Sequence, residues 1–185
     1  MHPAPDSWQG PRLVGVSIPI PDPFGGFLQS KRAEYRDPLA ATTIAHVTLL
    51  GPTKLTEDGL PALVEHLDGA AAAAGPFRMV LRGTGTFRPV SPVVFVQVAE
   101  GISSCEQLEG AICSGEYDRT RDFPYHPHVT VAHNVGEDEL DRAFEELAGF
   151  TARFVVEQFW MYEQDGGGVW QPMRAFSLGR RVGRA

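Results

Sequence analysis

The sequence predicts an α+β fold built from two similar lobes. The triplet His-x-Thr occurs twice, at residues 46–48 and 128–130, each time within a short run of residues that favour β-strands. Each triplet is followed by a polar loop, acidic residues and an amphipathic run. Each half of the chain reads strand, helix, strand, helix, strand, so we interpret the chain as an internal duplication.

The elements can be placed in order within each half. Residues 12–18, 46–49 and 77–87 read as strands of the first half, and residues 27–36 and 60–74 as its helices. The corresponding segments of the second half are strands at 93–98, 128–131 and 152–162, and helices at 102–113 and 137–148. The helices are indicated by apolar residues at helical spacing, such as Leu63 and Leu67 in the first half and Leu140 and Phe144 in the second.

These elements define the expected domain organisation. We expect a flexible tail at residues 1–11 and one two-lobed domain at residues 12–182. The internal repeats span about 12–87 and 93–163, and a final strand is expected at about 169–179. A chain of 185 residues, 43% of them hydrophobic, is long enough for one sizeable core.

Composition also limits where the protein works. No apolar run approaches the roughly 20 residues that span a bilayer, and the first residues lack the pattern of a signal peptide. Cys105 and Cys113 lie about two turns apart in one predicted helix, too far for a disulfide, and we expect buried, reduced thiols. A cytoplasmic protein without membrane partners is the expectation.

The formal net charge of −7 argues against binding of long duplex nucleic acid, which normally needs a broad basic surface. A small or single-ended phosphate ligand remains compatible with this charge. Arg119 and Arg121, just before the second triplet, are candidates to contact such a ligand, and solvated surface arginines are the alternative.

The triplets themselves indicate acid-base chemistry. In a strand, side chains two positions apart share a face, so His46 lies beside Thr48 and His128 beside Thr130, while the intervening valine faces the packed side. If the two strands meet across a cleft, two imidazoles and two hydroxyls surround one small volume. Imidazole titrates near pH 6.5, so one neutral and one protonated ring can coexist near neutrality.

A metal site is the alternative for these histidines, because His126 and His128 share a strand face and His133 follows closely. Pro127 disturbs regular pairing there, and no Asp, Glu or Cys completes a ligand set at short range. We therefore expect neither a metal nor another cofactor, and we place His126 at the entrance of the strand, near the substrate.

The segments HVTL at residues 46–49 and HVTV at 128–131 carry a family resemblance. Two His-x-Thr strands in a duplicated α+β chain of this length resemble the two-histidine (2H) phosphoesterase superfamily, and more narrowly its 2′-5′ RNA ligase and RNA cyclic phosphodiesterase branch. The resemblance covers residues 13–178. It implies two antiparallel sheets that face a central cleft, with helices outside, and it implies His46, Thr48, His128 and Thr130 as the catalytic residues.

The resemblance implies a metal-independent phosphoesterase that hydrolyses 2′,3′-cyclic phosphodiester ends of RNA or small cyclic nucleotides. Attack by a ribose hydroxyl in place of water would join RNA ends through a 2′-5′ bond at the same site. Two alternatives stay open: a cyclic phosphodiesterase for a nucleotide-sugar metabolite, and a module that binds nucleotides or RNA without turnover. We expect a monomer whose partners are RNA ends or small cyclic nucleotides.

Three aromatic residues are candidates for contact with a nucleobase. Phe87 and Tyr162 occupy matching places in the two repeats, and Tyr125 lies just before the second triplet. Their rings could offer flat surfaces to a base. Core packing is the alternative for each of them.

Overall fold

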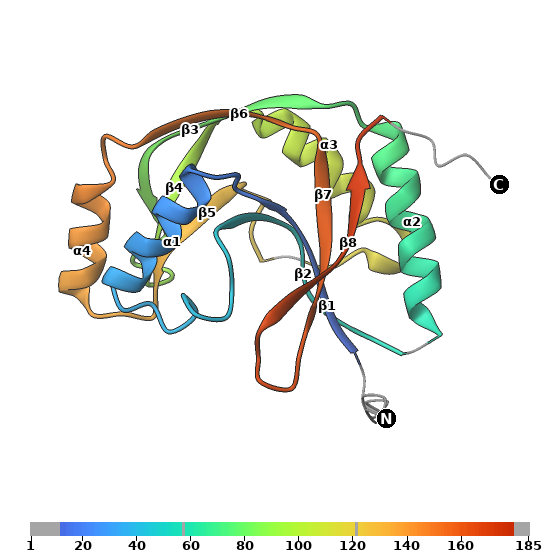
Figure 1. The fold of residues 1–185 in the computed structure, drawn as a ribbon, viewed down its shortest axis with the longest axis horizontal. Helices are drawn as coiled ribbons and strands as arrows, with labels where there is room; N and C mark the ends of the chain where they lie inside the picture. Colours follow the sequence, from blue (N-terminus) through green and yellow to red (C-terminus); the bar gives the residue numbers. More distant parts are fainter. Residues whose placement is uncertain (1–11, 57, 121, 180–185) are drawn as a thin grey trace, which may run out of the picture.

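The computed structural model describes residues 12–56, 58–120 and 122–179. Within them, two four-stranded antiparallel sheets and four α-helices make up the fold (Figure 1). The predicted α+β class, with two antiparallel sheets, is confirmed. The predicted tail at residues 1–11, Arg121 and the last residues of the predicted domain, 180–182, lie outside the described residues.

The first sheet has the strand order β2-β1-β7-β8. Its strands are β2 (His46–Leu55), β1 (Arg12–Pro19), β7 (Gln158–Gln164) and β8 (Trp170–Ser177). The second sheet has the order β5-β4-β3-β6. Its strands are β5 (His128–His133), β4 (Val93–Glu100), β3 (Phe77–Thr86) and β6 (Thr151–Val156). Every pair of neighbouring strands is antiparallel.

The two sheets exchange strands between the sequence halves. Strand β3 of the first half pairs in the second sheet, and β7 and β8 of the second half pair in the first. The predicted single strand at 152–162 was wrong, because it divides at Glu157 into β6 and β7, which belong to different sheets. Both parts are extended and apolar, so the sequence pattern does not show where the chain leaves one sheet for the other.

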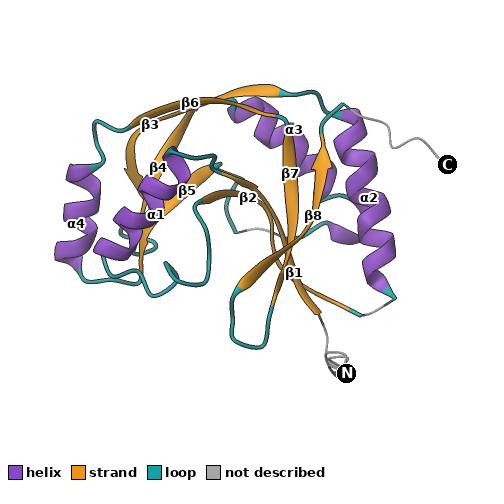
Figure 2. Ribbon diagram, viewed as in Figure 1, coloured by secondary structure: helices purple, strands orange, loops and turns teal. Residues whose placement is uncertain are grey.

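Two helices cover each sheet (Figure 2). Helices α2 (Gly59–Ala73) and α3 (Ile102–Ile112) pack on the first sheet, and α1 (Phe24–Glu34) and α4 (Glu137–Glu146) on the second. Each sheet therefore carries one helix from each half. A short 3-10 turn at Gly115–Tyr117 follows α3. Helix α1 begins three residues before its predicted start, directly after Pro23, whose fixed φ suits a helix start.

The exchange places the two His-x-Thr strands beside each other. Strands β2 and β5 are edge strands of their sheets, and they contact one another across the junction of the sheets. The predicted alternation is present in both, since Val47 and Val129 are fully buried while the flanking His and Thr residues are half-buried. One face of each strand packs in the core, and the other is open to solvent and ligands.

Both cysteines lie in the core. Cys105 is fully buried and Cys113 nearly so, and neither forms a disulfide. No helix within residues 12–56, 58–120 and 122–179 is long and apolar enough to cross a membrane.

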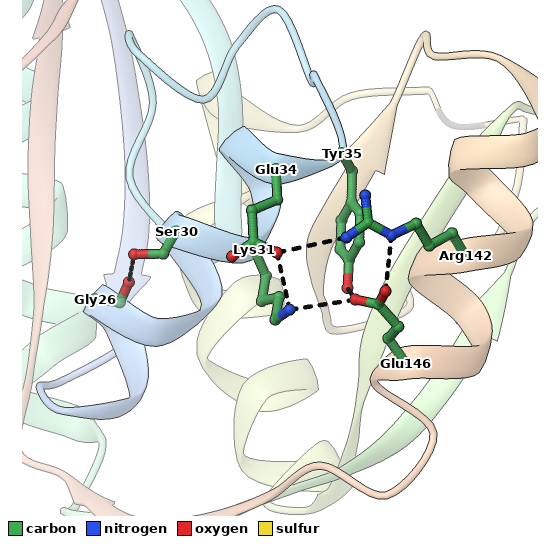
Figure 3. Close-up of polar contacts among 7 residues, drawn as sticks. All are labelled: Gly26, Ser30, Lys31, Glu34, Tyr35, Arg142 and Glu146. Carbon is green, nitrogen blue, oxygen red and sulfur yellow. Dashed lines mark hydrogen bonds and ion pairs between the residues drawn. The ribbon is translucent and has the colours of Figure 1, made fainter.

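A polar network joins α1 to α4 (Figure 3). The Tyr35 hydroxyl donates to Glu146 at 2.9 Å, Arg142 Nε donates to the same carboxylate at 2.7 Å, and Lys31 Nζ reaches it at 3.2 Å. Lys31 also pairs with Glu34. Arg142, together with Tyr35 and Lys31, lowers the pKa of Glu146 from 4.5 to about 2. The network ties the two helices of the second sheet to each other.

Replacing Tyr35 by phenylalanine keeps the buried ring and removes only the hydroxyl. We expect the melting temperature to fall by roughly 2–4 °C at pH 7, the effect of one lost hydrogen bond in a domain of this size. Because the pKa of Glu146 is lowered on folding, its contribution is present above pH 4.5 and is lost as the pH falls towards about 2. Melting curves of both proteins should therefore converge over that range; a constant gap would contradict the assigned bond.

Candidate active site

The imidazoles of the two triplets are held in the same way. His46 Nδ1 lies 2.6 Å from the carbonyl oxygen of Ile44, and His128 Nδ1 lies 2.7 Å from that of His126. A carbonyl can only accept, so each Nδ1 carries the proton in the neutral ring. Each Nε2 is then the basic atom of its ring. The two rings are thus equivalent in tautomer and in the backbone position that fixes them.

The threonines follow their histidines on the open face. Thr48 Oγ1 lies 3.1 Å from His46 Nε2 and can donate its proton to that nitrogen. Thr130 occupies the matching place in β5, two residues after His128, and is half-buried. The structure therefore brings all four predicted catalytic residues to the open faces of two adjoining strands.

A small cavity of about 210 Å³ lies on the first-sheet side of Thr48. His46 and Thr48 line it together with Tyr162 and Trp170. Tyr162 is only 7% exposed, and burial raises the pKa of its hydroxyl to about 12. This tyrosine, predicted as a base-stacking candidate, packs in the wall of the cavity and keeps its proton at neutral pH.

A larger cavity of about 550 Å³ lies on the second-sheet side. Thr48 belongs to both cavities, and Phe87, Tyr125, His126 and His128 line the larger one. The Tyr125 hydroxyl donates to the Thr48 carbonyl at 2.8 Å, which ties the loop before β5 to β2. The predicted binding candidates Phe87, Tyr125 and His126 therefore gather around one of the two imidazoles.

Aromatic rings surround His128. The Phe87 ring meets it edge to face at a centroid distance of 5.0 Å, Phe95 lies at 5.1 Å, and His126 at 6.2 Å. Gly85 makes this arrangement possible, because a Cβ atom there would come within 2.5 Å of the Phe95 ring. The absence of a side chain at this glycine thus shapes an aromatic wall.

Burial changes the proton affinity of both histidines. Desolvation lowers the pKa of His46 below 6.5, and the positive charges of Arg32 and of protonated His128 lower it further. The pKa of His128 is lowered by desolvation and by His126. The ordinary imidazole pKa expected from the sequence is therefore wrong for both rings, because the packed cleft disfavours their charged forms.

Other predicted candidates lie outside this cluster. Arg119 Nη2 donates to the hydroxyl of Thr53 on β2 at 3.0 Å, and the arginine lines neither of the two cavities. Arg121 lies outside the described residues. His133 ends β5 opposite Val93. Within the described ranges, no group of three His, Cys, Asp or Glu residues is arranged to hold a metal ion.

Sequence reasoning missed several residues of the two cavities, among them Ser17, Trp170 and Phe123. Ser17 pairs with Thr48 across β1 and β2, Trp170 closes the small cavity, and Phe123 lines the large one. The apolar alternation marks Ser17 as a polar residue within an otherwise buried strand, and this signal could have drawn attention to it. Trp170 is brought in from the far end of the chain, and nothing local indicates that position.

Comparison with known proteins places the chain among phosphoesterases. The family model of the 2′-5′ RNA ligase superfamily matches residues 20–168. A provisionally named phosphoesterase of Halalkalibacterium halodurans is 27% identical over 168 residues, 90% of this chain and 97% of the relative. A second one, from Oceanobacillus iheyensis, is 28% identical over 146 residues, 78% of this chain and 85% of the relative.

Solved structures share the fold. Escherichia coli LigT complexed with 3′-AMP superposes with a TM-score of 0.69 at 17% identity, covering 92% of this chain and 99% of LigT. The protein TT0787 of Thermus thermophilus superposes with a TM-score of 0.58 at 26% identity, covering 91% of this chain and 98% of that protein. The family model spans most of the chain, including both His-x-Thr strands, and the chain therefore belongs to the 2′-5′ RNA ligase superfamily of two-histidine phosphoesterases.

Proposed function

We propose that this protein is a cyclic phosphodiesterase that opens 2′,3′-cyclic phosphates at RNA ends or on small nucleotides, with His46 and His128 as its acid and base. The observation that carries the proposal is the matched pair of imidazoles. Each Nδ1 is bonded to the carbonyl two residues earlier in the chain, so each Nε2 is the nitrogen that transfers a proton. At His46 this nitrogen also contacts the Thr48 hydroxyl, which would exchange that contact for one with the phosphate.

The reaction needs a base and an acid on opposite sides of phosphorus. One neutral Nε2 takes the proton of a water molecule as its oxygen attacks phosphorus. The bond from phosphorus to one ribose oxygen breaks, and the other ring, protonated at Nε2, gives its proton to that oxygen. Thr48 and Thr130 donate hydrogen bonds to the non-bridging oxygens, where negative charge builds up in the transition state. Neither step requires a metal ion.

The surroundings suit a nucleotide. The large cavity offers the rings of Phe87, Phe123 and Tyr125 to a base, while the shared Thr48 borders the phosphate position. Solved complexes of LigT contain 3′-AMP, ATP, NADP+ and phosphate, so a relative of the same fold takes up small phosphates and nucleotides. The net charge of −7 favours small or single-ended substrates over long nucleic acids. Attack by a ribose hydroxyl in place of water gives 2′-5′ ligation at the same two rings.

The experiment measures hydrolysis of 2′,3′-cyclic mononucleotides and of an RNA oligomer that ends in a cyclic phosphate, with and without excess EDTA. Turnover unchanged by the chelator supports the proposal. Turnover abolished by EDTA would favour the metal alternative, and binding of nucleotides without turnover would favour a non-catalytic module. An RNA oligomer with a free 5′-hydroxyl in the same assay reads out ligation.

The lowered histidine pKa values predict the pH optimum. The base works only above its pKa and the acid only below its own, so kcat/KM follows a bell that lies between the two values of the free enzyme. Because both values lie below 6.5, we expect the maximum of kcat/KM below pH 6.5 and a fall towards pH 8. Steady-state rates between about pH 4.5 and 8.5, measured at constant ionic strength, check this, and a maximum above pH 7 would contradict the assignment.

A further inference from the structure

A buried ion pair joins helix α1 to the segment that leads to His46. Arg32 on α1 donates from Nε to Asp37 Oδ2 at 2.7 Å, and the two residues are 3% and 5% exposed. Removing two charges from water costs free energy that their attraction rarely exceeds, and apolar residues of similar size often serve a core as well. Stability alone therefore does not account for this pair, and its neighbours indicate another role.

The pair fixes the segment between α1 and β2. The second carboxylate oxygen of Asp37 accepts the backbone N–H of Leu39 at 2.8 Å. Arg32 Nη1 reaches the Thr43 carbonyl at 3.5 Å, and Gln29 of the same helix donates to that carbonyl at 3.1 Å. Helix α1 is itself held to α4 by the network around Glu146 (Figure 3). The segment between α1 and β2 is thus bonded to a helix that is itself bonded to α4.

The same segment holds the His46 ring. Its residue Ile44 provides the carbonyl that accepts the Nδ1 proton of His46 at 2.6 Å. The next residue, Ala45, is bonded to Ile20 at the end of β1, and Thr42 to Trp170 at the start of β8. Leu39, Thr43 and Ile44 also line the small cavity. Hydrogen bonds to Thr43 and to Ile44, two residues joined by a peptide bond, therefore connect the ion pair to a proposed catalytic imidazole.

We propose that Arg32 and Asp37 are positioning residues for the reaction: they hold the backbone segment whose Ile44 carbonyl orients His46, and they place a permanent cation near that ring. The proposal rests on the proposed function, because it requires His46 to act in catalysis. The groups around His128 differ from those around His46. The carbonyl that orients His128 belongs to His126 in the loop before β5, and the neighbouring ionisable group there is the His126 ring. The two rings thus share a tautomer and differ in the charge beside them.

The cation has a measurable consequence at His46. Desolvation is the largest cause of its lowered pKa, and the charge of Arg32 and that of protonated His128 add to it. Asp37 carries the opposite charge and is bonded to the Arg32 guanidinium. Removing Arg32 together with Asp37 should therefore raise the pKa of His46 and leave that of His128 unchanged.

The test is the double variant R32M/D37L, in which apolar side chains replace both charges and preserve the packing. NMR titration of 13C-labelled histidine is expected to show the His46 resonance titrating at higher pH and His128 as in the parent. We expect kcat on a cyclic mononucleotide to fall by roughly tenfold to a hundredfold, with KM nearly constant, because the ring loses its fixed orientation. Unchanged titration and unchanged kcat in a folded double variant would overturn the proposal.

Two further variants complete the design. Arg32→Lys keeps a cation but not the planar fork of the guanidinium. The pKa of His46 should therefore stay as in the parent, while kcat should fall at least about tenfold. If the double variant does not fold, a parental kcat in Arg32→Lys overturns the proposal. R174M/D68L, which removes a more exposed ion pair between β8 and α2, is the control for loss of an ion pair elsewhere and should change neither readout. The histidine titration does not depend on turnover. If the parent protein has no activity, the proposed function is wrong, and the titration still tests whether the ion pair acts on His46.

Discussion

Replacing either His46 or His128 by alanine is expected to lower kcat on a 2′,3′-cyclic mononucleotide by about 10²–10⁴-fold, with a small change in KM. Each ring transfers one proton in the transition state and contributes less to binding of the ground state, so the loss falls on kcat. Because the two rings act together, the double variant should be only slightly slower than either single one. Initial rates over a range of substrate concentrations measure both parameters.

The matched control for these variants is His133→Ala. His133 lies in the same strand as His128, at its far end, and lines neither cavity, so its loss should leave kcat unchanged. A binding module would give another pattern, in which His46→Ala or His128→Ala weakens nucleotide affinity and no variant alters a rate. Equal loss of activity in all three variants would point to a general effect on the fold.

Replacing Thr48 or Thr130 by valine is expected to lower kcat by about 10²–10³-fold. Valine has nearly the shape of threonine and lacks the hydroxyl that would donate to a phosphate oxygen, so the strand is kept and the donor is lost. Serine at the same positions keeps the hydroxyl and should retain most of the rate. For Thr48 the valine variant also removes the 3.1 Å contact with His46 Nε2.

The two threonine sites can be told apart by the pH profile. Thr48→Val should move the limb of kcat/KM that belongs to His46, since the hydroxyl contacts that ring, and Thr130→Val should reduce the rate without such a shift. Rates for all four variants on one cyclic mononucleotide provide the comparison. A serine variant as slow as the valine variant would assign the loss to packing and remove the hydroxyl from the mechanism.

The local pattern of the chain was sufficient to predict most elements. Alternation around Val47 and Val129 placed each His and Thr on one strand face, and helical spacing marked the two helices that follow the His-x-Thr strands. The paired sheets were expected from the resemblance and are present. The strands and helices depend on residues that are close in sequence, and the spacing of apolar residues predicts them directly.

What depends on distant contacts could not be predicted. The division at Glu157 is invisible because Val156 and Phe159 are both buried, each in a different sheet. The Arg32–Asp37 pair looks like two surface charges in the sequence, since only the packing of α1 shows that both are buried. Lowered histidine pKa values also follow from burial in the cleft, and a triplet on its own does not specify its solvent exposure.

The exchange of strands has a consequence for the order in which the protein can form. Val14 of β1 pairs with Glu163 of β7, so one side of β1 stays unpaired until a segment that follows it by about 150 residues has been synthesised. Pairings this far apart in sequence close slowly. During refolding, helix formation and the β1–β2 pair should therefore precede the closure of the first sheet, and the small cavity beside His46 gains its Tyr162 and Trp170 walls only at that late step.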